Sequence, residues 1–357
     1  MAVTSDNYSS INLEENCTLN ANGINGKGAV AGSNGTININ NGTINVSGQW
    51  GYGIFVYGEN TKLNMTSGTI NVTGNDSTGL SSNDKGEIHL QGTSKVNVSG
   101  NQSTALGNFD FGKIFVKDSP VIEANGNNGI GACSSNGGNI DIQGSPIISA
   151  TGDWGAGIIV GTGGNMNIQG GRINAKKFGL NVYSEDKQKG SKLNMSSSVQ
   201  VNVADEDGLG LIIRGEGATA KIGDLTINAP KEEFVEYGTP FNLINFEQYI
   251  PYTPDNLQIY WNSDDYNEGL AKTYEVCGVV NWPNSIKINR AIFMFKNVTV
   301  NYSGKDVNHD GIVDTKDLLL ISDNYNLTPS APNSQLDLNG DNIIDIFDLI
   351  IASKKIN

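Results

Sequence analysis

Short runs in which apolar and polar residues alternate fill the first two thirds of the chain. Residues 53–57, 62–65 and 69–72 are three such runs, with Ile, Leu, Val or Met at every second position. A period of two predicts β-strands, and the Gly, Asn and Ser clusters between the runs predict turns. Three short strands and three turns therefore make up one structural unit.

The unit repeats every 26 residues along the chain. This spacing is kept without a slip by one glycine column: Gly48, Gly74, Gly100, Gly126 and Gly152. A single coil of three strands cannot bury its inward apolar residues, whereas stacked coils form one continuous core. We therefore predict a mainly β chain whose residues 1–230 form a parallel β-helix of about eight three-stranded coils. We expect Gly and Asn to recur because the corners need a positive φ.

The repeat resembles the pectate-lyase-like family of right-handed β-helices. Its coils of the type Gly-Thr-Ile-Asn-Val-Ser-Gly, as in residues 42–48, are similar to those of non-catalytic, carbohydrate-binding members. The resemblance implies the fold, and it implies that the solenoid binds a plant polysaccharide that is pectin-like or cellulose-like.

The outward positions of the strands decide what such a solenoid can bind. On the second and third strands they are mostly Asn, which we interpret as self-paired amide ladders. Aromatic rings and an Arg lie on or beside the first strand, and rings of this kind stack on sugars. The predicted carbohydrate-binding residues are Phe55, Tyr57, Phe109, Tyr183 and Arg214, with Trp50 and Trp154 at a neighbouring corner. The alternative is that a loop or the next domain covers these rings.

Two turn aspartates form a candidate for an additional Ca²⁺ site. Asp84 and Asp110 are 26 residues apart, so they are expected to stack about 4.8 Å apart on adjacent coils. Two carboxylates at that spacing repel one another unless a cation bridges them. With Lys85 or Lys113 as base, the same cluster would suit a polysaccharide lyase. The alternative interpretation is a pair of solvated charges.

After residue 230 the repeat stops and short alternating strands, prolines and aromatic residues follow. The order of Trp261, Tyr266 and the segment 273–278 resembles bacterial Ig-like modules. We predict a small Ig-like β-sandwich over residues 231–303 that acts as a spacer.

The last part of the chain, residues 304–357, carries two loops with the ligand spacing of an EF-hand. Oxygen-bearing side chains stand at loop positions 1, 3, 5, 9 and 12, and position 7 offers a backbone carbonyl. The predicted Ca²⁺ ligands are Asp306, Asn308, Asp310, Ile312, Asp314 and Asp317 in the first loop, and Asp337, Asn339, Asp341, Ile343, Asp345 and Asp348 in the second. At position 6 the loops have Gly311 and Asn342, and Asn also tolerates a left-handed turn.

Leu- and Ile-rich helices are predicted directly after the loops, over residues 315–325 and 346–355, whereas no helix precedes the first loop. Loop–helix, linker, loop–helix resembles a type I dockerin. The resemblance implies two bound Ca²⁺ ions and a cohesin module of a scaffoldin as partner, as in cellulosomes. Its recognition pairs carry over to Thr315 and Lys316, and to Ile346 and Phe347. Because the pairs differ in charge and polarity, we expect one dominant docking orientation. Phe347 has an alternative role in closing the small helical core.

Composition removes several classes of function. The net charge is −14, which would repel a phosphate backbone and argues against a nucleic-acid partner. No apolar run approaches the roughly 18 residues that a membrane span needs. Cys17, Cys133 and Cys277 are odd in number and widely spaced, which predicts buried free thiols. The first residues lack the features of a signal peptide. Since dockerins act outside the cell, we expect a secreted, extracellular protein whose signal peptide is absent from this sequence.

These observations predict a secreted β-helix, Ig-like spacer and dockerin that binds polysaccharide without cleaving it. Two alternatives stay open: a dockerin-borne polysaccharide lyase, and a structural rod or adhesin. Only three Arg residues occur in the chain, and clustered carboxylates are scarce on the strand faces, which favours binding over catalysis.

Overall fold

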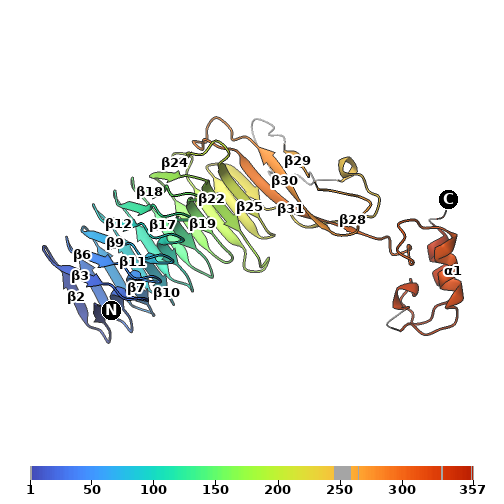
Figure 1. Ribbon diagram of the computed structural model, residues 1–357, viewed down its shortest axis with the longest axis horizontal. Coiled ribbons are helices and arrows are strands. Elements are labelled where there is room, and N and C mark those ends of the chain that lie inside the picture. Colours follow the sequence, from blue (N-terminus) through green and yellow to red (C-terminus); the bar gives the residue numbers. More distant parts are fainter. Residues whose placement is uncertain (1, 245–258, 264, 331–332, 355, 357) are drawn as a thin grey trace. The chain divides into compact units, whose positions relative to one another are not determined.

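The computed structural model describes residues 2–244, 259–263, 265–330, 333–354 and 356 (Figure 1). They fall into two compact units. The first takes in residues 2–230, 259–261 and 277–295, and the second takes in residues 231–244, 262–276 and the described part of 296–357.

The first unit is a right-handed parallel β-solenoid, as predicted. Its strands lie in three sheets and stack coil upon coil (Figure 1). Sheet A begins with β1 (Val3–Ser5), β4 (Lys27–Ala31), β7 (Tyr52–Tyr57), β10 (Thr78–Asn83), β13 (Thr104–Asn108), β16 (Ile130–Ser134), β19 (Ala156–Val160), β22 (Phe178–Tyr183) and β25 (Leu209–Arg214). Sheet B consists of β2 (Ser10–Leu13), β5 (Thr36–Ile39), β8 (Lys62–Met65), β11 (Glu87–Leu90), β14 (Lys113–Val116), β17 (Asn139–Ile142), β20 (Asn165–Ile168), β23 (Ser191–Met195), β26 (Ala218–Ile222) and β27 (Leu225–Asn228). Sheet C consists of β3 (Thr18–Ala21), β6 (Thr43–Val46), β9 (Thr69–Val72), β12 (Lys95–Val98), β15 (Val121–Ala124), β18 (Ile147–Ala150), β21 (Arg172–Ala175) and β24 (Gln200–Val203).

The register of the strands follows the 26-residue repeat. Ile70 pairs with Val96 and Val96 with Ile122, so like residues stack on like residues through the core. These inward side chains are fully buried. Outward Asn side chains pair with one another, for example Asn71 Nδ2 with Asn45 Oδ1 at 2.9 Å. Both the continuous core and the amide ladder on sheet C are therefore confirmed.

The glycine column has a different cause from the one predicted. A Cβ atom at Gly74 would lie 2.0 Å from the carbonyl oxygen of Gly48, and the same overlap recurs along the column. Glycine is required by close stacking of backbones, because no positive φ occurs at these five positions. The positive φ falls two residues later, on non-glycine residues that include Trp50, Asp76 and Trp154.

The C-terminal end of the solenoid is closed by a later part of the chain. β27 turns back antiparallel on β26, and the first residues of β31 (Ile292–Asn301) pair in parallel with β25 on sheet A. Ile288 forms a bridge to Val201, and Ile288 and Met294 join the solenoid core. Part of the segment 231–303 therefore covers apolar residues that the last coil would otherwise expose.

The sandwich predicted for 231–303 is not confirmed. Besides β31, the described strands of this segment are β28 (Glu233–Glu236), β29 (Tyr260–Asn262) and β30 (Thr273–Val280), and a 3₁₀ turn covers Phe241–Leu243. All of these strands belong to sheet A. The second sheet that a sandwich requires is not seen in the described residues.

Two short helices follow the loops at the C-terminal end. They are α1 (Thr315–Asp323) and α2 (Ile346–Ser353), with a 3₁₀ turn at Ser334–Leu336 between them. Both start at the predicted residue; α1 ends two residues before the predicted end, and residue 355, the predicted end of α2, lies outside the described residues. A small cluster forms their core: Val307, Ile321, Leu336, Ile344 and Ala352.

Candidate functional site

The first loop is held by two carboxylates that accept backbone N–H groups. Asp306 Oδ2 accepts from Gly311 N at 2.9 Å, and its Oδ1 accepts from Asp310 N at 3.2 Å. Asp317 Oδ2 accepts from Asp314 N at 2.8 Å and its Oδ1 from Asn308 N at 3.2 Å. Asp314 in turn caps α1, so the loop and the start of the helix form one hydrogen-bonded unit.

The second loop repeats most of this arrangement, but Asp337 Oδ1 accepts from Gly340 N at 2.8 Å, at loop position 4, where Asp306 Oδ1 accepts from position 5. Asp337 Oδ2 accepts from Asn342 N at 2.9 Å, and Asp348 accepts from Asp345 N at 2.7 Å and from Asn339 N at 3.2 Å. Asn342 takes φ 71°, beside 89° for Gly311, so the left-handed turn predicted for position 6 is confirmed in both loops. Asp345 caps α2 as Asp314 caps α1.

The predicted ligand oxygens form a mixed set of donors. In the part of the chain that the structure describes, no three Asp, Glu, His or Cys side chains gather closely enough to hold a metal ion. The four Asp side chains predicted as ligands in each loop are therefore not gathered into such a group, although carboxylates, an Asn side-chain oxygen and a backbone carbonyl are ligand types that suit Ca²⁺. Asp317 and Asp348 are fully buried, and buried carboxylates favour a nearby cation.

The predicted partner-binding residues open the two helices and are exposed. Thr315 and Lys316 are the first residues of α1, and Ile346 and Phe347 are the first residues of α2. Phe347 is 57% exposed, so it does not close the helical core.

The side chain of Lys316 places a positive charge beside the carboxylates of the first loop. Its ammonium lies 3.0 Å from Asp310 Oδ2 and 3.8 Å from Asp314 Oδ2. The hydrogen bond from Lys316 lowers the pKa of Asp310, and the same bond raises the pKa of Lys316. In the second loop the equivalent residue is Phe347, which has no charge. The two loops therefore differ electrostatically although their backbones match.

The aromatic residues predicted on the first strand do not form one surface. On β7, Phe55 lies 5.2 Å from Tyr52 and 5.4 Å from Tyr57, measured between ring centres. The guanidinium of Arg214 lies over the ring of Tyr183 at 5.4 Å, and four strands separate β7 from β22 in sheet A.

The other predicted rings occupy separate places as well. Phe109 follows β13 and packs against Gly107. Trp154 neighbours Phe178, with ring centres 6.2 Å apart, and lies on another coil from Trp50. The face thus holds several small aromatic groups. None of the three cysteines forms a disulfide, as predicted, but they are half-buried and not buried.

Asp84 and Asp110 take equivalent positions in turns of adjacent coils. Both have a positive φ, and Asn136 of the next coil donates a hydrogen bond to Asp110. Lys85 is 3.6 Å from Glu59, and Lys113 is 3.3 Å from Glu87. The lysines that were considered as bases are therefore paired with glutamates.

A groove of about 480 Å³ lies beside these turns and was missed by sequence reasoning. It runs across four coils, and its lining includes Lys62, Lys85, Glu87, Phe111 and Lys113. A sequence signal for it exists: Phe111 stands where the neighbouring coils have Asn60, Lys85 and Gly137, as the register of the coils shows.

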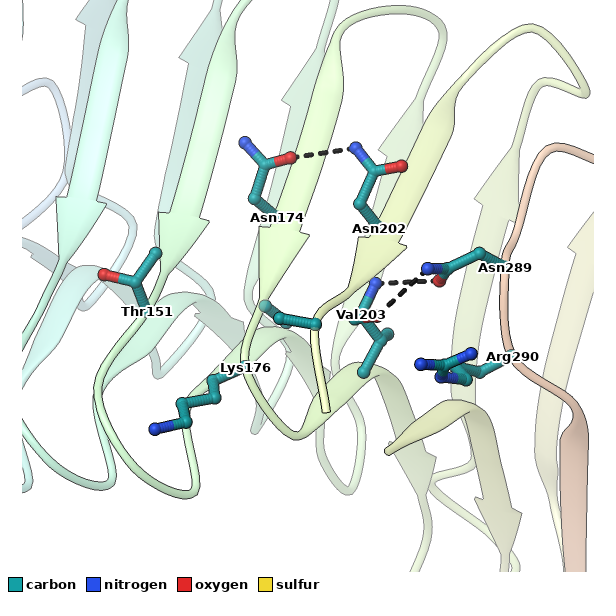
Figure 2. A pocket seen from close by; sticks show the side chains of 9 residues that line it. Thr151, Asn174, Lys176, Asn202, Val203, Asn289 and Arg290 are labelled. Carbon is teal, nitrogen blue, oxygen red and sulfur yellow. Dashed lines mark hydrogen bonds between the residues drawn. The ribbon is translucent and has the colours of Figure 1, made fainter. Parts of the chain in front are cut away.

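A second cavity, of about 420 Å³, lies at the end of sheet C (Figure 2). Figure 2 shows Asn202 donating to Asn174, and Asn289 bonded to the backbone of Val203. Arg290 donates to the backbone oxygen of Asp205 at 2.9 Å. These polar groups join the segment 277–295 to the last coils, which is a structural role.

None of the helices in the described residues has the length and apolar character needed to cross a membrane. Comparisons of the chain with family models, with curated proteins and with solved structures found no match.

Proposed function

We propose that this chain is a secreted component of a cellulosome-type complex. In this proposal residues 304–357 are a type I dockerin that binds a scaffoldin cohesin, and the solenoid binds plant polysaccharide. The observation that carries the proposal is the duplicated loop–helix unit, in which two loops with the same ligand spacing share the hydrogen bonds from position 6 to position 1 and from position 9 to position 12.

Ca²⁺ would supply positive charge that holds the loop oxygens together. Asp306 and Asp317 would hold it in the first loop, and Asp337 and Asp348 in the second, with the other predicted ligands completing each set. Because Asp317 and Asp348 also take part in the capping boxes of α1 and α2, ordering a loop also orders the start of its helix.

The helix surfaces support a protein partner. On α2, Ile346, Phe347 and Ile350 are exposed although they are large and apolar. Exposed apolar residues that gather on one short helix are typical of an interaction surface. The corresponding first residues of α1 are Thr315 and Lys316, so the two helices offer different chemistry to a cohesin.

The test is retention of the full chain on immobilised type I cohesins, with Ca²⁺ or with EDTA. We expect retention only with Ca²⁺, and loss of retention in a variant with Asp317→Asn and Asp348→Asn. The exposed Asp323, outside the loops, gives the matched control Asp323→Asn. Retention that persists in EDTA, and that is equally strong in the double variant, would contradict the proposal.

The alternative function is a polysaccharide lyase, and one observation favours it: the stacked turn positions of Asp84 and Asp110 beside lysines. An ultraviolet assay for unsaturated products, run beside binding assays on insoluble polysaccharides, separates the two functions. Product release supports the lyase, and binding without products supports the proposed function.

A further inference from the structure

An aromatic ring is displayed at the corner between sheets A and B. Phe111 takes φ 64°, as the equivalent residues Asn34, Asn60 and Lys85 of earlier coils also take a positive φ, but unlike them it carries an aromatic ring, which is 63% exposed. Its ring lies against Gly137 of the next coil, where a Cβ would be only 2.4 Å from Phe111 Cδ1. Glycine at 137 therefore lets the ring rest on the backbone and turn its other face to solvent.

Three lysines line the same groove as this ring. On adjacent strands β8, β11 and β14, Lys62 and Lys113 flank Glu87, with N–O distances of 3.8 and 3.3 Å. Burial acts to raise the pKa of Glu87, but its hydrogen bond with Lys113 and the charges of Lys113, Lys62 and His89 lower it overall. Glu87 therefore stays charged and holds the two lysines in place.

The side chains that line the groove carry a slight excess of positive charge on an acidic protein. Its lining carries three lysines (62, 85 and 113) and two glutamates (59 and 87), a net charge of 3 − 2 = +1, whereas the chain carries −14. Asp84 and Asp110 precede Lys85 and Phe111 in the same turns, but they do not line the groove.

We infer that this groove is a binding subsite for a sugar chain carrying anionic groups, with Phe111 stacking on a sugar ring and Lys62 and Lys113 binding its carboxylates or sulfates. The inference rests on the proposed polysaccharide binding and places it at this corner. It thereby favours pectin-like over cellulose-like ligands. Stacking on an exposed ring and pairing with lysine are both independent of catalysis.

The chain provides a matched control for Phe111. Tyr8 occupies the equivalent turn position four coils earlier, with the same φ of 64°, and is 85% exposed. The equivalent residue of the next coil after Tyr8 is Asn34, so Tyr8 has no glycine against which its ring can rest. Phe111→Ala and Tyr8→Ala therefore remove comparable exposed rings from the same kind of corner.

The experiment is affinity electrophoresis of the full chain in gels with polygalacturonate or dextran sulfate, beside methyl-esterified pectin and dextran as uncharged partners. The first anionic probe carries carboxylates and the second carries sulfates, so the two arms distinguish the sources of charge. We expect Phe111→Ala to weaken binding to at least one anionic probe about tenfold, and Tyr8→Ala to leave it unchanged. Lys62→Gln with Lys113→Gln is expected to weaken binding and reduce its salt dependence.

The outcomes separate the subsite from the wider function. Binding that is equal in the Phe111 variant and the wild type, or equally tight to the charged and uncharged polymers, would overturn the subsite and leave polysaccharide binding intact. A wild-type chain that binds none of these polymers or insoluble polysaccharides contradicts polysaccharide binding itself.

Discussion

The solenoid and the loop–helix pairs reach a stable fold by different means. The solenoid buries a continuous column of Ile, Val, Leu and Met side chains through every coil. The loop–helix pairs have five buried core residues and two Asp-rich loops. A core this small supports little stability by itself, so folding and ion binding are expected to be coupled in one region and independent in the other.

Removing Ca²⁺ should separate the two regions most strongly. With EDTA, we expect the amides of α1 and α2 to lose hydrogen-exchange protection, because their capping carboxylates would repel one another without a cation. The amides of the solenoid strands should keep their protection. Helices that stay protected in EDTA would show that the small core alone is sufficient to keep α1 and α2 folded.

A core substitution in the solenoid should have the opposite effect, destabilising the solenoid and leaving the loop–helix pairs unchanged. Ile88 is fully buried, and Ile88→Ala is expected to lower the free energy of unfolding of the solenoid by about 2–5 kcal/mol. Ca²⁺ affinity should be unchanged. Denaturant unfolding and calorimetry measure the two quantities, and a parallel fall in both would contradict independent regions.

Within the loop–helix pairs, the buried carboxylates should be the most sensitive positions. Asp348→Asn is expected to lower the Ca²⁺ affinity of the second loop at least about 100-fold, since changing even an outer partner of a metal ligand costs up to roughly that factor. The first loop should change little. Calorimetric titration measures both loops, with Asp323→Asn as control.

The two helix starts should contribute unequally to cohesin binding. Exposed apolar side chains on α2 are expected to dominate, so Ile346→Ala with Phe347→Ala should weaken binding about tenfold or more. Thr315→Ala with Lys316→Ala should have a smaller effect. Equal losses in the two double variants would mean that both orientations are used.

The smallest effect concerns the ammonium in the first loop. Because Lys316 shares Asp310 with the predicted Ca²⁺ ion, Lys316→Gln is expected to raise the affinity of the first loop about two- to fivefold, with little change in the second. The mirrored substitution Phe347→Lys should lower the affinity of the second loop. An unchanged first loop in Lys316→Gln would show that the ammonium does not compete.

The parts that sequence predicts well are those in which spacing alone determines geometry. The 26-residue period predicts the coils, and the 12-residue loop pattern predicts where α1 and α2 begin. The close stacking at Gly74 was not predicted, because a recurring glycine does not reveal whether φ or crowding requires it. Residues 277–295 close the end of the solenoid, but they contain no repeat from which this role could be predicted.

The candidate site likewise has one part that the sequence predicts and another part that it does not. Loop ligands are local in sequence, so their positions follow from the motif. Phe111 and the lysines near it come from three different coils, and only the register brings them together. The contact of Lys316 with Asp310 depends on a side-chain conformation that spacing does not determine.

The most direct test of the account is a calorimetric titration of the full chain with Ca²⁺. We predict two bound ions for each chain, and none in the double variant Asp317→Asn with Asp348→Asn, whose solenoid stays folded. A wild-type chain that binds no Ca²⁺, or a double variant that still binds two ions, would contradict the central claim.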